Sequence, residues 1–343
     1  MSQKKITIHD VAERAGVSVT TVSLVLSGKG RISTLTAQRV SEAIDALGYV
    51  RNRSAASLRG GESGIIGLIV RDICHPFYAE MTAGLSEVLE AQGKILVLTQ
   101  SGAAGQNLQR CFDSLLAQGV DGIVLGGGAE KAGALPALAQ EAGIALVCAA
   151  RASSLEEVDA IRPDNMQAAR MATEYLIKQG HRRIAWLGGS GSSLTRAERI
   201  GGYCATLMQY GLPFRPEWII ECERPAIAAR TEALFHAFPS ITAILCHNMT
   251  VALSCYFGAL RAGRRPGEGA VESWYGQQVA LVGFGDAPQA EMHDLPLTRV
   301  SIPARETGRQ AALRLLHRLD QPQSGAQSII LPAALAEHGA FDA

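Results

Sequence analysis

The sequence contains no run of apolar residues that approaches the ~18 needed for a membrane-spanning helix. Its first ten residues, MSQKKITIHD, lack the apolar segment of a secretory signal peptide, so we expect a cytoplasmic protein. The seven cysteines are scattered without CxxC spacing, which argues against a disulfide framework or a zinc site and favours reduced thiols.

The chain also has no net charge, with 32 Lys and Arg residues against 32 Asp and Glu residues, but the charges are unevenly distributed. Residues 1–61 hold nine basic and four acidic residues, a net charge of +5. The remainder holds 23 basic and 28 acidic residues, a net charge of −5. A small basic segment on an acidic body fits a nucleic-acid-binding domain whose body is repelled by phosphate.

Motifs of the common enzyme classes are missing as well. The Gly126–Gly128 run lacks the further glycine of a GxGxxG fingerprint, and no Walker A motif is present. The run GGSGS at residues 188–192 lacks the last glycine of a nucleophile elbow. The histidines show neither HExxH nor zinc-ligand spacing. We therefore predict no catalytic residue, no metal and no cofactor: the chain is not an enzyme.

The segment from Thr7 to Ser27 carries the pattern of two short helices. Apolar residues share one face of the first helix at Ile8, Val11, Ala12 and Ala15. Gly16 ends that helix, and Ser18 is a suitable N-cap for a second helix over Val19–Ser27. Two helices joined by a three-residue turn containing Gly form a helix-turn-helix, whose second helix fits the major groove of DNA. The alternative is an ordinary helical hairpin on the protein surface.

A third helix is predicted over Thr34–Leu47, between the N-cap Ser33 and the terminating Gly48. Its apolar face should complete a three-helix core and consists of Leu35, Val40, Ala43, Ile44 and Leu47. Residues 52–59 have the pattern of two further helical turns. Such a segment is too short to be stable alone, so we expect it to fold against a partner copy or on DNA.

From Ser63 onward the sequence has α/β character. Short apolar runs alternate with helical stretches and predict strands at 65–70, 95–99, 122–125, 145–148, 183–187, 243–246 and 279–283. This alternation implies doubly wound parallel sheets, and its length favours two Rossmann-like lobes. A ligand would bind in a crevice at the carboxyl ends of the strands.

The crevice rule selects residues that follow predicted strands. They are Arg71, Pro76 and Phe77 after the first strand, Ser193, Thr195 and Arg199 after the fifth, Asn248 after the sixth, and Gly285 and Asp286 after the seventh. Two alternatives remain open. Phe77 could belong to the core, and Arg199 could be a helix-surface arginine paired with Glu198.

Together these runs resemble the LacI/GalR family of bacterial transcription regulators. The resemblance rests on TIHDVA (7–12), AGVS (15–18), TVS (21–23) and LGY (47–49), with Asn52, Arg53, Ala55 and Leu58, and continues through SGIIGL (63–68) and HRRIA (181–185) to Pro332. It implies a small all-α helix-turn-helix domain (1–50), a hinge helix and linker (51–61) and a two-lobed, periplasmic-binding-protein-like core (62–343). Three crossovers are expected near residues 162, 288 and 318, so that lobe 1 spans about 62–162 and 288–318, and lobe 2 about 163–287 and 319–343.

The resemblance also implies which residues contact DNA: Thr7, Ser18, Val19, Thr20, Thr21, Ser23, Leu24, Ser27, Arg31, Asn52, Ala55 and Leu58. Val19 and Thr20 stand where family members read bases. Leu24 stands at a third reading position where many relatives carry Arg, which can bond bidentately to guanine. Leucine offers only apolar contact, so we expect a different base pair there. Leu58 matches the residue that wedges into the central minor-groove step, the alternative being packing between two hinge helices.

For the effector the resemblance implies contacts from Arg71, Phe77, Ser193, Thr195, Arg199, Asn248 and Asp286. Two positions depart from the family pattern. Met249 stands where relatives often have Asp, and Gly285 stands where many sugar-responsive relatives have an Asp that accepts bonds from two hydroxyls. The loss of that carboxylate weakens the case for an ordinary free sugar and leaves an unusual effector, or none.

The combined prediction is a repressor that binds a pseudo-palindromic operator in double-stranded DNA as a homodimer, associates with the nucleoid rather than with a membrane, and responds to a small molecule such as a sugar. A constitutive repressor and a sugar-binding module with an incidental DNA-binding segment are the alternatives. Some family members form tetramers through a C-terminal tail with leucine heptads. The tail 333–343 has none, which favours a dimer.

Overall fold

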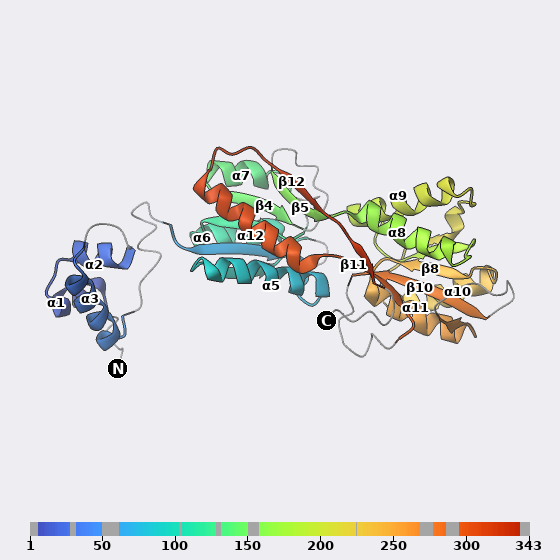
Figure 1. Cartoon of the computed structure of the whole chain (residues 1–343), viewed down its shortest axis with the longest axis horizontal. Helices are drawn as coiled ribbons and strands as arrows, with labels where there is room; N and C mark the ends of the chain where they lie inside the picture. The colour runs from blue at the N-terminus through green and yellow to red at the C-terminus, as the bar shows by residue number, and fades with distance from the viewer. Residues whose placement is uncertain are drawn as a thin grey trace. The chain divides into compact units, whose positions relative to one another are not determined.

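The computed structural model describes residues 6–27, 32–49, 62–102, 105–127, 132–149, 158–223, 225–267, 277–285 and 295–336. The chain divides into two compact units, Met1–Ser63 and Gly64–Ala343 (Figure 1). None of the helices in these described ranges is both long and apolar enough to cross a membrane. The predicted hinge segment 51–61 lies outside the described residues.

The first unit is a three-helix domain with helices α1 (Ile8–Ala15), α2 (Val19–Ser27) and α3 (Thr34–Leu47). Its core is formed by Val11, Ala12, Ala15, Val22, Val40 and Ala43. Gly16 ends α1 with a φ of 64°, a left-handed conformation that suits glycine. The Ser33 hydroxyl caps α3 by accepting from the Thr36 amide at 3.2 Å. The helix-turn-helix predicted from the sequence is therefore present.

One predicted core residue of this domain is misplaced. Leu35 is 71% exposed and contributes nothing to the three-helix core. At about 100° per residue, Leu35 lies about 140° around α3 from the fully buried Val40, so it points away from the apolar face. Ile44 and Leu47 do pack against the core, as expected.

The second unit contains two sheets. The first has the order β12-β5-β4-β3-β1-β2, and all its strand pairs are parallel. Its strands are β1 (Ile65–Val70), β2 (Ile95–Gln100), β3 (Gly122–Leu125), β4 (Ala145–Ala149), β5 (Asp159–Pro163) and β12 (Ser328–Leu331). The second sheet has the order β13-β11-β10-β8-β6-β7, with β9 paired to β10.

In the second sheet all pairs are parallel except β11 with β13. Its strands are β6 (Ile184–Leu187), β7 (Ile219–Ile220), β8 (Ala243–Cys246), β9 (Arg265–Pro266), β10 (Gln278–Phe284), β11 (Thr298–Ser301) and β13 (Ala334–Ala336). The predicted doubly wound parallel fold is confirmed, and the seven predicted strands agree with observed strands to within one residue at each end.

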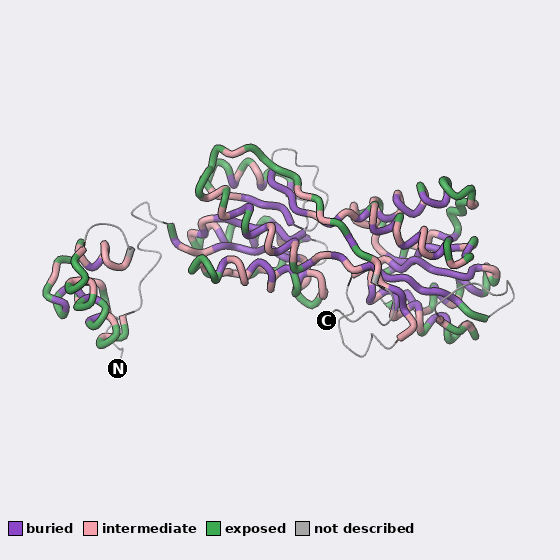
Figure 2. Tube along the Cα trace, viewed as in Figure 1, coloured by how far each residue is buried: buried purple, intermediate pink, exposed green. Residues whose placement is uncertain are grey.

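Helices cover both faces of each sheet, and the strands between them are largely buried (Figure 2). Lobe 1 is built on the six-stranded sheet, and lobe 2 on the other sheet. In lobe 1, α5 (Pro76–Ala91) and α12 (Ala304–Asp320) cover one face of the sheet, and α6 (Leu108–Ala117) and α7 (Leu135–Glu141) cover the other. In lobe 2, α8 (Asn165–Lys178) and α9 (Leu194–Gln209) lie opposite α10 (Ile227–Ala237) and α11 (Met249–Arg261), and the short helix η2 (Pro216–Trp218) precedes β7.

The chain crosses between the lobes three times: from β5 to α8, from β11 to α12, and from β12 to β13. The first crossover, at 163–164, lies next to the expected position near 162. The other two lie at 302–303 and 332–333, so the positions predicted near 288 and 318 are wrong. The reason is that β11 pairs with β10 in lobe 2, whereas β12 pairs with β5 in lobe 1.

Candidate functional site

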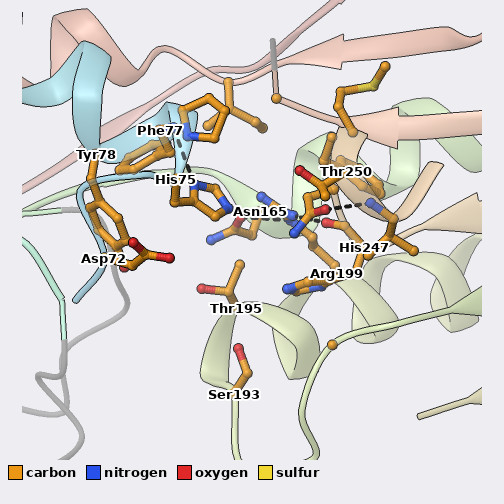
Figure 3. A pocket seen from close by; sticks show the side chains of 18 of the residues that line it. Asp72, His75, Phe77, Tyr78, Asn165, Ser193, Thr195, Arg199, His247 and Thr250 are labelled. Carbon is orange, nitrogen blue, oxygen red and sulfur yellow. Dashed lines mark hydrogen bonds between the residues drawn. The ribbon is translucent and has the colours of Figure 1, made fainter. Parts of the chain in front are cut away.

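A cleft lies between the two lobes of the second unit, at the carboxyl ends of their strands, as the crevice rule predicts (Figure 3). Its cavity volume is about 330 Å³, within the range of small-molecule sites. The walls come from loops after β1, β6, β7, β8 and β10 and from the first two crossovers, which contribute Pro163 and Ile302.

The structure brings most of the predicted effector residues together in this cleft. Arg71, Pro76, Phe77, Ser193, Thr195, Arg199, Asn248 and Gly285 all line it. Asp286 lies outside the described residues. The Phe77 side chain is half-buried and also packs against the cores of both lobes, so the two roles considered for it are compatible. Contact between these predicted effector residues and a ligand stays a prediction.

Side chains of the cleft lining cap three of the helices that begin at the cleft. His75 Nδ1 accepts from the Phe77 amide at 3.2 Å at the start of α5, and the Ser193 hydroxyl accepts from the Arg196 amide at 3.3 Å at the start of α9. Asn248 Oδ1 accepts from the Val251 amide at 2.8 Å at the start of α11. The positive ends of three helix dipoles therefore face this cavity, and the capping bonds hold its polar side chains in place.

Arg199 is held firmly in the cleft wall. It is 7% exposed, its Nε donates to Asn165 Oδ1 at 3.0 Å, and its Nη1 donates to the His247 carbonyl at 2.6 Å (Figure 3). Its guanidinium also lies 4.6 Å from the centre of the Phe284 ring. The alternative of a helix-surface arginine is wrong, because Arg199 is buried in the cleft wall, and Glu198 accepts hydrogen bonds from Arg162 and Asn165.

Several cleft residues were not predicted from the sequence. Those with polar side chains include Asp72, His75, Tyr78, Asn165, Glu223, His247 and Thr250. His75 caps α5 two residues before Phe77 and follows the same strand, so the crevice rule could have included it. Asn165 could have been found only by predicting β5, since Asn165 stands two residues after the end of that strand. Among the described residues no group of three or more His, Cys, Asp and Glu side chains could hold a metal ion.

The departure at Gly285 has a conformational basis. Its φ is 94°, a value that L side chains rarely adopt, although a Cβ at this position would meet no heavy atom of the described residues within 4 Å. Strain rather than crowding therefore opposes an aspartate here. The cleft wall carries a glycine and the buried Met249 at the two positions where the sequence resemblance led us to look for carboxylates.

On the first unit, α2 presents the predicted base-reading residues. Thr7, Ser18 and Thr20 are exposed, and Val19, Thr21, Ser23 and Leu24 are half-buried. Val22 is fully buried. Thr20 and Leu24 each lie about 160° around α2 from Val22, one in each direction, so both are on the outward face of the helix. Arg31, Asn52, Ala55 and Leu58 lie outside the described residues, as does the side chain of Ser27.

The hydroxyls at the helix starts also have local roles. The Thr7 amide and hydroxyl both donate to Asp10 Oδ2, at 2.7 and 2.6 Å, which completes a capping box on α1. The Ser18 hydroxyl accepts from the Thr21 amide at 3.1 Å. These bonds fix the backbone at the N-termini of both helices of the helix-turn-helix.

A helix-turn-helix domain followed by a two-lobed, cleft-bearing body defines a transcription regulator of the type suggested by the sequence. Residues 7–52 match the model of bacterial regulatory proteins of the lacI family, and residues 63–339 match that of periplasmic binding proteins and the sugar-binding domain of the LacI family. The chain belongs to the LacI family.

Among curated relatives, the maltose regulon regulatory protein MalI of Escherichia coli K12 is 54% identical over 335 residues, which cover 97% of this chain and 98% of MalI. A structure of the Lac repressor dimer bound to operator and the anti-inducer ONPF has a TM-score of 0.83 at 25% identity and covers 97% of this chain and 98% of its own. A CelR–cellobiose complex has a TM-score of 0.69 at 28% identity, with 98% of this chain and 100% of that chain covered. These named relatives are regulators rather than enzymes.

Proposed function

We propose that this protein is a sequence-specific transcriptional repressor that binds a pseudo-palindromic operator as a homodimer in the cytoplasm, associated with the nucleoid. The observation that carries the proposal is the outward face of α2, where Thr20 and Leu24 stand opposite buried Val22. One such helix reads only a few base pairs of the major groove, so two copies are needed for a full operator.

A maltose-related or other sugar-metabolism operon is the proposed target, because the 54% identity to MalI extends over nearly the full length of both chains. The cleft between the lobes is the proposed effector site. Its size, aromatic residues and capped helix ends suit a small polar ligand such as a carbohydrate. In the solved relatives, CelR is complexed with cellobiose and the Lac repressor with ONPF.

For the dimer, exposed apolar side chains on both lobes offer a surface. The edge strand β2 exposes Ile95 and Leu98, and α11 exposes Phe257 and Leu260. An uncovered apolar edge strand is a liability in a monomer, and a second copy would remove it. The Lac repressor structure that this fold resembles is named as a dimer.

The test is selection of bound duplexes from a random library by the full chain at two salt concentrations. We expect enrichment of one pseudo-palindrome and a steep loss of binding at the higher salt, because phosphate contacts release counterions. The recovered operator then serves to screen carbohydrates, maltose-related sugars first. If no sequence is enriched, the repressor proposal fails.

A constitutive repressor is the second candidate, and Gly285 favours it, since a glycine with positive φ stands there in place of an expected ligand carboxylate. It predicts the same selected operator but no small molecule that alters its binding. The carbohydrate screen therefore separates the two candidates, whereas the selection tests both.

A further inference from the structure

A single carboxylate bonds to residues on both sides of the first crossover. Arg162 belongs to β5 of lobe 1, and Asn165 is the first residue of α8 in lobe 2. Glu198, on α9 of lobe 2, accepts from Arg162 Nη1 through Oε1 at 3.1 Å and from Asn165 Nδ2 through Oε2 at 2.9 Å. Only Pro163 and Asp164 separate the two donors along the chain. The Glu198 carboxylate thus spans the first of the three crossovers between the lobes.

The same set of bonds continues into the cleft. The Asn165 side chain is fully buried, and its amide donates to Glu198 while its carbonyl oxygen accepts from Arg199 Nε. Figure 3 shows Asn165 and Arg199 side by side at the cleft. Asparagine suits this position, because an aspartate could not donate to Glu198 and a leucine could not accept from Arg199.

We propose that Asn165 and Glu198 are positioning residues that orient Arg199 in the cleft, and that the Arg162–Glu198 ion pair makes this orientation depend on the angle between the lobes. This proposal rests on the proposed function of the cleft as the effector site. Arg162 moves with lobe 1, whereas Glu198, Asn165 and Arg199 move with lobe 2. A rotation about residues 163–164 therefore acts first on the Arg162–Glu198 pair, and a ligand that bonds to Arg199 acts on the same chain of contacts from its other end.

The ion pair can be broken without touching the rest of the chain of contacts. The variant R162Q removes the charge on the lobe 1 side and leaves Glu198, Asn165 and Arg199 in place. R309Q is a matched control, because it breaks the ion pair between Arg309 and Glu87, which join at 2.9 Å inside lobe 1 and away from the crossover. Both partners of the control pair are more exposed than Arg162 and Glu198. R162K, which keeps a positive charge, tests rescue.

Trp186 offers a spectroscopic readout of the Arg199 position. Its ring centre lies 5.8 Å from that of Phe284, on which the Arg199 guanidinium stacks. Replacing Trp218 and Trp274 by Phe makes Trp186 the sole fluorophore among the three tryptophans of the sequence. The buried Trp218 Nε1 has no hydrogen-bond partner among the described residues, so W218F removes no bond found there.

In this background of the full chain we would measure Trp186 emission without DNA, the dissociation constant for the selected operator, and the unfolding midpoint. We expect R162Q to shift the emission and to change operator affinity by at least about fivefold, R162K to return both toward the unsubstituted values, and R309Q to leave both unchanged. If R162Q and R309Q give the same emission and the same affinity, the proposal is overturned, whatever their midpoints.

If R162Q shifts the emission but leaves operator affinity unchanged, the proposed dependence of the Arg199 orientation on the angle between the lobes is overturned. The proposed repressor function fails by a different result, namely that the unsubstituted chain shows no preference for any duplex. The emission comparison of R162Q with R309Q still tests the positioning of Arg199 in that case.

Discussion

At the scale of single residues, Leu24 gives the most specific prediction about which base the protein contacts in its operator. It shares the outward face of α2 with Thr20 and is half-buried against its own domain, so its methyl groups rather than a polar atom would meet the base edge. An apolar group at that point suits a thymine methyl and gives guanine no donor.

The variant L24R should therefore change the operator at one base pair. We expect selection with L24R to recover guanine at the position read by residue 24, with discrimination worth about 1–3 kcal/mol, and the other positions to be unchanged. Parallel selection with the unsubstituted chain is the control. Identical consensus sequences from the two proteins would show that residue 24 does not face a base.

Cys222 lines the cleft but is unsuited to chemistry there. Burial raises the pKa of its thiol to about 11, so the reactive thiolate is scarce near neutral pH. Iodoacetamide should modify the exposed Cys74 well before Cys222, as read by mass spectrometry of peptides, and the modification of Cys222 should increase as the pH rises toward its pKa. A C74S variant that is labelled as fast as the unsubstituted chain would contradict this order.

Residue-level prediction from the sequence succeeded where a side chain followed an obvious strand and failed elsewhere. Arg199 and Asn248 follow apolar strands and were placed in the cleft correctly. Asn165 was missed because β5, with the sequence DAIRP, begins with an acid and ends with a proline. Its Asp159 is nonetheless fully buried, since Arg314 Nε and Arg318 Nη2 donate to it at 2.6 and 2.7 Å. Partners more than 150 residues away cannot be inferred from the local pattern.

At the scale of elements, α5 and α12 form the tightest contact in lobe 1. A Cβ at Gly84 would lie 2.0 Å from the Arg305 carbonyl oxygen, and a Cβ at Gly308 would lie 2.0 Å from that of Met81. Both helices begin at the cleft. Glycine at the two contact points lets their backbones approach closely enough to behave as one rigid pair.

Alanine at position 84 should disrupt this packing. We expect G84A to lower the free energy of unfolding by about 2–3 kcal/mol in urea titrations, because the clash is with backbone atoms. G201A is the matched control within α9, where the new methyl would meet only Met166 Cε at 3.5 Å. It should be neutral or stabilising by up to about 1 kcal/mol. Equal stabilities of the two variants would rule out the close contact.

The same elements explain why the crossovers were predicted too early. The strands β5, β11 and β12 carry polar residues, and β13 is only three residues long, so the apolar pattern of all four is weak. The seven predicted strands were found because each is a run of mostly apolar residues, as burial between two helix layers requires. The lobe to which a short strand belongs depends on pairing across the whole unit, which local sequence does not encode.

At the scale of the whole molecule, the apolar surfaces on β2 and α11 should determine the assembly. We expect the full chain to sediment as a dimer, at about twice its 36.3 kDa mass, at micromolar concentration. L98K on β2 should shift it toward monomer and weaken operator binding, since two helix-turn-helix domains must act together. M208K, at an exposed methionine of α9, should stay dimeric. A stable tetramer would contradict the dimer, and an L98K dimer would place the contact elsewhere.

The central claim is that this protein recognises one DNA sequence through the outward face of α2. The most direct measurement is the dissociation constant of the full chain for the selected operator and for a scrambled duplex of the same length and composition, at one salt concentration. We expect tighter binding to the operator by at least about 10³-fold. Equal affinities for the two duplexes would contradict it, because the binding would then come from phosphate contacts alone.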